Sequence, residues 1–350
     1  MGVTVKRSGE VIKPETAAAS AIPSGLLGVP DVVAVPPSVA LTARAVDQPS
    51  RVKDFISLTK PEVLFLVLVA TGLGCVMASK SLDLLTLMHA LIGTALVAGG
   101  TAALNHYIER ATDSLMRRTA RRPLPSGRLK PNEVLMFGIG LSLKGIVYLA
   151  FTLNLLTGLI GLAALLSYLL LYTPLKRRSR LCTLVGAFPG AAPVLMGWAA
   201  VRGDLGPEAW VLFAILFLWQ FPHFLAIGWM YREDYARAGM LMIPDVKENT
   251  DVNEDSGRMT FSLIRRTAQA LVVVSFLPTL MGMTTGVYLC SALLLGVSLL
   301  YVVNGATSDR SAVAAKHLLH ATVIYLPLLF LFLVLCRTDV VAGWPFWSSQ

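Results

Sequence analysis

Nine long apolar stretches are the feature that most limits how this chain can fold. A helix needs roughly 20 mainly apolar residues to cross a membrane, and backbone groups in lipid must be hydrogen-bonded within the segment. Each stretch has that length, and only the third contains a charged side chain, Lys144. We therefore expect an all-α membrane protein. Its nine transmembrane helices are predicted at 63–79, 84–104, 134–153, 155–172, 181–201, 209–231, 267–283, 286–303 and 318–336.

The composition agrees with a lipid environment. Hydrophobic residues make up 55% of the chain and charged residues 15%, whereas soluble domains have about 25% charged residues. The net charge of +9 would suggest nucleic acid only if the basic residues shared a soluble surface. Instead, all but four of them fall in the N-terminal segment and in alternate loops, on one side of the membrane; the exceptions are Lys80, Lys144, Arg202 and Arg337. The charge therefore reports topology, and no nucleic-acid partner is expected.

Because basic loops stay inside, the N-terminus and the long loops are predicted to be cytoplasmic. The alternative is the matrix side of a mitochondrial inner membrane. Residues 1–50 are predicted to be a disordered tail, 51–340 the nine-helix domain and 341–350 a C-terminal tail. Glu10, Glu15 and Asp31 interrupt the basic residues of the first tail, which argues against a mitochondrial presequence and favours a bacterial inner membrane. The four cysteines stand singly, so neither a disulfide framework nor a zinc site is expected.

Oxygen-bearing side chains recur every four residues after the second apolar stretch. Asn105, Glu109 and Asp113 have the spacing that places them on one face if the helix continues. Stacked carboxylates repel unless a cation lies between them, and oxygen ligands with room for water and phosphate suit Mg²⁺. The alternative is a helix end whose carboxylates are simply solvated.

Arginines follow this acidic motif closely. Arg118 and Arg122 belong to a group of five within thirteen residues of Arg110. Guanidinium groups beside a metal site are what a metal-bridged diphosphate needs, since they bind its remaining oxygens bidentately. A positively charged inside loop would account for some of them without any ligand.

Two further polar groups are predicted on the same side of the membrane. Lys176 and Arg177 follow the fourth stretch, and they serve either as membrane anchors or as additional diphosphate donors. His223 and Asp234 are eleven residues apart, close to three helical turns, so both can face one cavity if the helix persists past Pro222. An ionisable residue in lipid is a candidate for function.

Together these motifs resemble the UbiA-type superfamily of intramembrane prenyltransferases, and within it the haem O synthase family. The resemblance runs from Leu58 to Phe330. Two departures stand out: Glu109 replaces the usual Asp of the first metal motif, and Asp234 lacks the repeated DxxxD of the wider superfamily. The matching strings are Asn105-x3-Glu109-x3-Asp113, Met116-x-Arg118-Thr119-x2-Arg122-Pro123-Leu124, Tyr172-Thr173 with Lys176-Arg177, and Trp219-Gln220-x-Pro222-His223-Phe224.

The resemblance implies a UbiA-type helical bundle and a reaction. The chain would transfer the farnesyl group of farnesyl diphosphate to a vinyl group of haem B, with addition of water, giving haem O and diphosphate. It also implies an association with haem A synthase or with oxidase assembly.

It implies roles for particular residues as well. Asn105, Glu109, Asp113 and Asp234 would bind Mg²⁺, and Arg118, Arg122, Lys176 and Arg177 would hold the diphosphate. His223 would contact haem, with His106, His317 and His320 as further candidates.

Three other functions remain open. A prenyltransferase of the same fold could act on an aromatic acceptor such as 4-hydroxybenzoate. A transporter could also have nine helices, with Lys144 as its one charge in mid-membrane. A haem-binding assembly factor would retain His223 but would give no reason for acids beside arginines.

Overall fold

The computed structural model describes residues 50–81, 83–243 and 257–342. Within them, nine helical segments are long and apolar enough to cross a membrane, as predicted. Most of the predicted tails, 1–49 and 343–350, lie outside the described residues. The spanning segments are α2 Pro61–Ala78, α3 Leu84–Asp113, α4 Pro131–Thr152, α5 with η1 and α6 Leu155–Leu175, α7 Cys182–Arg202, α8 Pro207–Met230, α10 with α11 Arg258–Leu280, α12 Gly286–Asp309 and α13 Ala312–Leu335.

Two helices depart furthest from their predicted bounds, each by nine residues at one end. Helix α3 continues nine residues past the predicted end at 104 and carries the acidic motif to its last turn at Asp113. Helix α10 begins at Arg258 rather than 267, because its polar first turns still bury Phe261 and Ile264. A search for apolar stretches misses such turns, because their buried apolar residues alternate with polar and charged ones.

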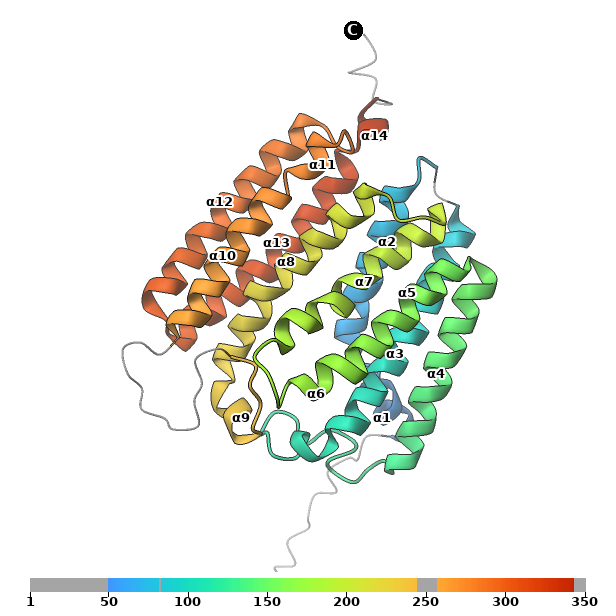
Figure 1. Cartoon of the computed structure of the whole chain (residues 1–350), viewed down its shortest axis with the longest axis vertical. Helices are drawn as coiled ribbons and strands as arrows, with labels where there is room; N and C mark the ends of the chain where they lie inside the picture. The colour runs from blue at the N-terminus through green and yellow to red at the C-terminus, as the bar shows by residue number, and fades with distance from the viewer. Residues whose placement is uncertain (1–49, 82, 244–256, 343–350) are drawn as a thin grey trace, which may run out of the picture. The chain divides into compact units, whose positions relative to one another are not determined.

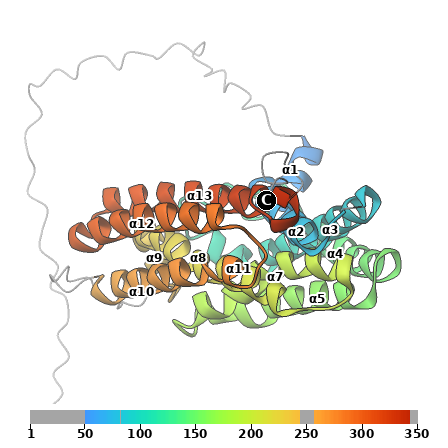
Figure 2. The same ribbon diagram turned by 90° about the horizontal axis from the view of Figure 1, so that it is seen from above.

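The helices lie side by side along the bundle (Figure 1). Contacts run from α2 through α3, α4, α5, α7, α8, α10 and α12 to α13, which contacts α2 again. Seen from above, α12 and α13 lie over α10 and α8 (Figure 2). Additional contacts join α2 to α7 and α8 to α13.

Short elements gather at one end of the bundle. This end holds α1 Arg51–Leu58, α6 Thr173–Leu175, α9 Arg232–Arg237 and the arginine-rich loop 114–130 (Figure 1), and we call it the basic end. The other end holds α11 Leu277–Leu280 and α14 Thr338–Ala342. The described parts of the loops predicted to be cytoplasmic therefore share one end.

Helix α5 changes character as it reaches the basic end. It passes at Ser167–Tyr172 into a π-helix, η1, a form that is rare and frequently marks functional sites. The ring of Tyr172, in η1, lies close to Gly186 of α7, where an added Cβ would stand 2.6 Å from it. The wider turn thus brings an aromatic side chain against α7.

Small residues allow α2 and α7 to cross closely. A Cβ at Gly197 would stand 1.9 Å from the carbonyl oxygen of Thr71, and one at Gly74 would stand 2.2 Å from the carbonyl oxygen of Val194. Without a hydrophobic driving force between helices in lipid, such close backbone packing contributes to association.

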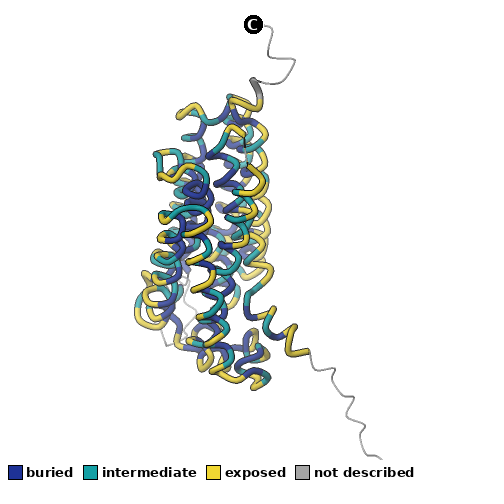
Figure 3. Tube along the Cα trace, turned by 90° about the vertical axis from the view of Figure 1, so that its right-hand side faces the viewer, coloured by how far each residue is buried: buried dark blue, intermediate teal, exposed yellow. Residues whose placement is uncertain are grey.

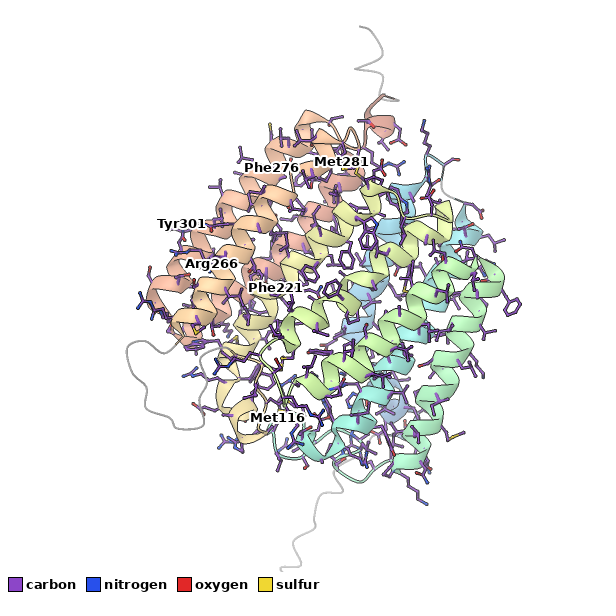
Figure 4. All side chains as sticks on the ribbon, viewed as in Figure 1. Met116, Phe221, Arg266, Phe276, Met281 and Tyr301 are labelled. Atoms are coloured by element: carbon purple, nitrogen blue, oxygen red, sulfur yellow. The ribbon has the colours of Figure 1, made fainter. Side chains whose placement is uncertain are left out.

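The outer faces of the bundle are apolar. Exposed residues run along the whole length of the helices (Figure 3), and they include large hydrophobic side chains such as Phe151, Leu294 and Tyr301, which are 86%, 70% and 81% exposed. Tyr301 extends outward from α12 (Figure 4). This surface suits lipid, and we describe the chain as a multi-pass membrane protein.

Candidate active site

The last turns of α3 form a buried polar face at the basic end. Asn105, Glu109 and Asp113 are 1%, 8% and 1% exposed and lie on successive turns of one helix. The predicted helix continuation is confirmed, and the face is buried rather than solvated.

Each carboxylate on this face is paired with a cation. Lys176 Nζ donates to Glu109 Oε1 at 2.7 Å, and Arg122 Nη1 donates to both carboxylate oxygens of Asp113 at 2.9 and 2.8 Å. Arg122 comes from the loop that turns back beneath α3, while Lys176 follows α6. The repulsion expected between stacked carboxylates is thus offset by two cations that the sequence resemblance placed at the diphosphate.

A third cation, Lys60, was not among the predicted site residues. Its Nζ donates to Asn105 Oδ1 at 3.0 Å, and it stands just before α2 with a left-handed φ of 52°. Burial, together with the positive charges of Lys176 and Arg122, lowers the pKa of Lys60 from 10.5 to about 8. The sequence signal was a lysine directly before the proline that begins a spanning helix.

A polar pocket of about 320 Å³ adjoins this face. His106 lines it, is 3% exposed, and has no hydrogen-bond partner on either ring nitrogen in the described part of the chain. Its Nδ1 lies 3.8 Å from Asp113 Oδ2. The other lining residues are Ser57, Lys60, Arg118, Arg121, Arg122, Pro123 and Arg128. Five cations around one pocket give it the charge and the hydrogen-bond donors that a multiply charged anion requires.

An apolar cavity of about 370 Å³ lies deeper in the bundle. Helices α2, α3, α5, η1, α7, α8 and α13 all contribute to its walls. Among its lining residues, Val63 and Leu66 of α2 and Phe224 of α8 are exposed on the bundle surface, so the cavity reaches the lipid-facing side. Lys60 lines both hollows. The polar pocket and the apolar cavity therefore share one lining residue, Lys60.

His223 stands in the wall of the apolar cavity. Helix α8 persists past Pro222 as the prediction required, and the His223 ring stacks on Trp219 with centroids 4.5 Å apart. The alternative haem candidates His317 and His320 are exposed and line neither hollow. His223 is therefore the predicted histidine that reaches the apolar cavity.

The structure does not join Asp234 to His223 in one helix. Helix α8 ends at Met230, and Asp234 belongs to the separate α9, where Arg237 Nη1 donates to its Oδ1 at 3.0 Å. Asp234 lines neither the polar pocket nor the apolar cavity. The expectation that the two side chains share one cavity was wrong, because the chain changes direction at Tyr231.

Helix α9 nevertheless lies against the arginine-rich loop. Met116 of that loop packs with Tyr235 and Met240, and Figure 4 shows Met116 beside α9 at the basic end. The guanidinium carbon of Arg118 lies 5.3 Å from the centre of the Tyr231 ring. Asp234 is thus near the loop that lines the polar pocket without entering it.

Two predicted or suspected cations lie outside the site. Arg177 is exposed and lines neither hollow, in contrast to its neighbour Lys176. Lys144 is exposed on α4 and also lines neither. The transporter alternative therefore lacks its mid-membrane charge inside the bundle.

Comparison with known families decides the class of protein. Residues 64–334 match the model of the UbiA prenyltransferase family. The chain belongs to that family. A protein of Solibacter usitatus named protoheme IX farnesyltransferase is 48% identical over 295 residues, which cover 81% of this UbiA-family chain and 99% of the relative. A protein of the same name from Koribacter versatilis is 43% identical over 300 residues, covering 83% and 94% of the two chains.

Solved structures agree on the fold of this UbiA prenyltransferase. A structure described as digeranylgeranylglyceryl phosphate synthase matches with a TM-score of 0.66 at 17% identity. The match covers 83% of this chain and 99% of that one. A UbiA homologue from Archaeoglobus fulgidus, bound to DMAPP and Mg²⁺, matches with a TM-score of 0.57 at 14% identity, over 80% and 99%. The predicted UbiA-type bundle is confirmed.

Proposed function

We propose that this chain transfers the farnesyl group of farnesyl diphosphate to a vinyl group of haem B, with addition of water, to give haem O and diphosphate. The observation that carries the proposal is the meeting of two hollows at Lys60, one lined by five cations and one apolar. A prenyl diphosphate has this division into a charged head and an apolar tail. The names of the curated relatives support farnesyl as the tail and haem as the acceptor.

The buried face of α3 has donors that fit Mg²⁺. Asn105, Glu109 and Asp113 offer hard oxygen ligands on one side of the helix, as this ion prefers. Among the described residues, no three His, Cys, Asp or Glu side chains come close enough to hold a metal by themselves, so phosphate oxygens and water would complete its coordination. When bound, Mg²⁺ would neutralise charge on the departing diphosphate. Asp234 stays a prediction as a further ligand.

The cations of this face would then change partners. Lys176 and Arg122 neutralise the carboxylates. If Mg²⁺ were bound by those carboxylates, both cations would be free to bind diphosphate oxygens. Arg118 and Lys60 already line the pocket. Donors held in place before the reaction stabilise charge as it develops on the leaving group.

The reaction itself requires a dry cavity. The C1–O bond of the farnesyl diphosphate breaks and the diphosphate keeps the electron pair; the vinyl group then forms a C–C bond to the allylic cation. Water adds to the resulting cation on the porphyrin side chain and loses a proton, which gives the hydroxyl group. The apolar walls would keep water from the allylic cation before the vinyl group reaches it.

The membrane is proposed to be the bacterial inner membrane, with the basic end in the cytoplasm. The unequal distribution of basic residues supports this orientation, and the organisms of the curated relatives support a bacterial cell. Association with haem A synthase or with oxidase assembly stays a prediction.

A product assay tests the proposal. Detergent-solubilised protein is given haem B, farnesyl diphosphate and Mg²⁺, and the porphyrins are separated and identified by mass spectrometry. The expected product is haem B with one farnesyl group and one hydroxyl group added across a vinyl double bond. Absence of this product from folded protein, with prenylated 4-hydroxybenzoate formed when that acceptor is offered, would contradict the haem assignment and favour the aromatic acceptor.

A further inference from the structure

His223 contacts the hydroxyl group of Thr322, which already donates its proton to a backbone carbonyl. Thr322 Oγ1 donates to the carbonyl oxygen of Leu319 at 2.7 Å, and the same Oγ1 lies 3.0 Å from His223 Nδ1. A hydroxyl has one proton and two acceptor lone pairs, whereas a carbonyl oxygen only accepts. The Leu319 contact therefore takes the proton, and Thr322 can only accept from the imidazole.

These two contacts of Thr322 determine the tautomer of His223. If Thr322 accepts, then Nδ1 carries the hydrogen, and in a neutral imidazole Nε2 is left with an unshared electron pair. The opposite assignment would place the Thr322 and Leu319 oxygens 2.7 Å apart without a proton between them.

The ring position directs this electron pair into the apolar cavity. His223 lines that cavity whereas Thr322 does not. Because Nδ1 faces Thr322, the ring edge left to face the cavity is the one that carries Nε2. Trp219 stacks on the ring with planes 22° apart, and its Nε1 donates to the backbone oxygen of Thr322 at 2.8 Å. Thr322 thus holds the ring by its hydroxyl and the stacking partner by its carbonyl. In the described part of the chain, His223 makes no hydrogen bond through Nε2.

We propose that Thr322 is a positioning residue that keeps His223 in the Nδ1–H tautomer, so that Nε2 binds the iron of the haem substrate from the cavity wall. This inference rests on the proposed function for the identity of the acceptor. An unprotonated imidazole nitrogen is a common axial ligand of haem iron, and a hydrogen bond to the other ring nitrogen orients such a ligand and raises its basicity.

Haem titration without farnesyl diphosphate tests this proposal apart from turnover. Haem B is added to the solubilised protein and followed by its absorption spectrum. The unmutated protein is expected to show an imidazole-ligated spectrum, and His223→Gly to lose it and regain it on addition of free imidazole. Thr322→Val is expected to weaken haem binding by about 10-fold or more, as loss of a hydrogen bond behind a metal ligand does, while Thr322→Ser retains it.

Thr267→Val is the matched control. Its hydroxyl also donates to a carbonyl oxygen of its own helix and contacts no histidine in the described structure, so haem binding should be unchanged. Unfolding midpoints of all variants are measured alongside. Should Thr322→Ser lose the spectrum as fully as His223→Gly does, or should His223→Gly keep it, the inference would be overturned.

The product assay distinguishes this failure from a failure of the proposed function. Haem O formed by a protein whose haem spectrum does not depend on His223 would overturn the positioning role alone. A His223-dependent spectrum without any farnesylated product would overturn the proposed reaction and leave the haem contact standing.

Discussion

Charge pairing governs the individual residues of the site. Glu109 and Asp113 are buried with Lys176 and Arg122 against them, and removing one partner of a buried pair leaves the other charge uncompensated. The same carboxylates are the proposed Mg²⁺ ligands. Their negative charge therefore both pairs with the buried cations and would bind the metal ion.

Asp113→Asn is expected to lower product formation by about 100-fold or more, since removal of one group that stabilises developing charge has effects of this size. The shape is kept and Arg122 retains partial solvent access, so the protein should stay folded. The measurement is haem O formation at saturating Mg²⁺, with the unfolding midpoint in parallel.

Asp83→Asn serves as control, because Asp83 caps the opposite end of the same helix and Asn caps equally well. Near-normal product formation by Asp113→Asn would show that the metal assignment is wrong.

Lys60→Met is expected to weaken binding of farnesyl diphosphate by about 10-fold or more, which corresponds to loss of one hydrogen bond to a charged group. Binding is measured with Mg²⁺ and without haem. Lys53→Met, on the exposed surface of α1, should bind normally. Equal affinities for Lys60→Met and the unmutated protein would remove Lys60 from the diphosphate site.

At the scale of the helices, the close crossing of α2 and α7 determines the shape of the site. The polar face of α3 and the apolar cavity depend on α2, which supplies Val63 and Leu66 to the cavity wall and packs on α7 through Gly74 and Gly197. The π-helical turn η1 places Tyr168 and Tyr172 in the same wall. Positions of helices relative to one another thus decide the width of the cavity.

Gly197→Ala is expected to destabilise the protein by about 1–3 kcal/mol, because the new methyl group would overlap the Thr71 carbonyl oxygen and force α2 and α7 apart. Gly72→Ala, on α2 with nothing within 4 Å of its added Cβ, should be neutral or slightly stabilising. Thermal unfolding in detergent compares the two. Equal midpoints would mean that the crossing is looser than described.

Topology governs the molecule as a whole. Helices that alternate in direction bring α1, the arginine-rich loop, α6 and α9 to one end (Figure 1), so residues far apart in sequence meet there. Lys60, Glu109 and Lys176 come from three separate segments of the chain.

Cysteine labelling tests the proposed orientation, in which the basic end faces the cytoplasm. In a Cys290→Ser background, which removes the exposed thiol, Ser126→Cys is expected to react with a membrane-impermeant maleimide from the cytoplasmic side and Ser81→Cys from the other side. Right-side-out and inverted bacterial vesicles give the comparison. Reversed labelling would contradict the proposed orientation.

By itself the sequence predicted the nine spanning helices that the described residues contain and the acidic face of α3 with its arginine-rich loop. Hydrophobic length and local charge are properties of short segments, and motif spacing is preserved along a helix such as α3. Only the tertiary structure decided which cation pairs with which acid, that Lys60 joins the two hollows, that Asp234 and Arg177 stay outside them, and that Thr322 holds His223. Apart from the Arg122–Asp113 pair, which spans nine positions, these contacts join residues 45 to 99 positions apart. There the angle and distance of helix packing, rather than the local pattern, determine which side chains meet.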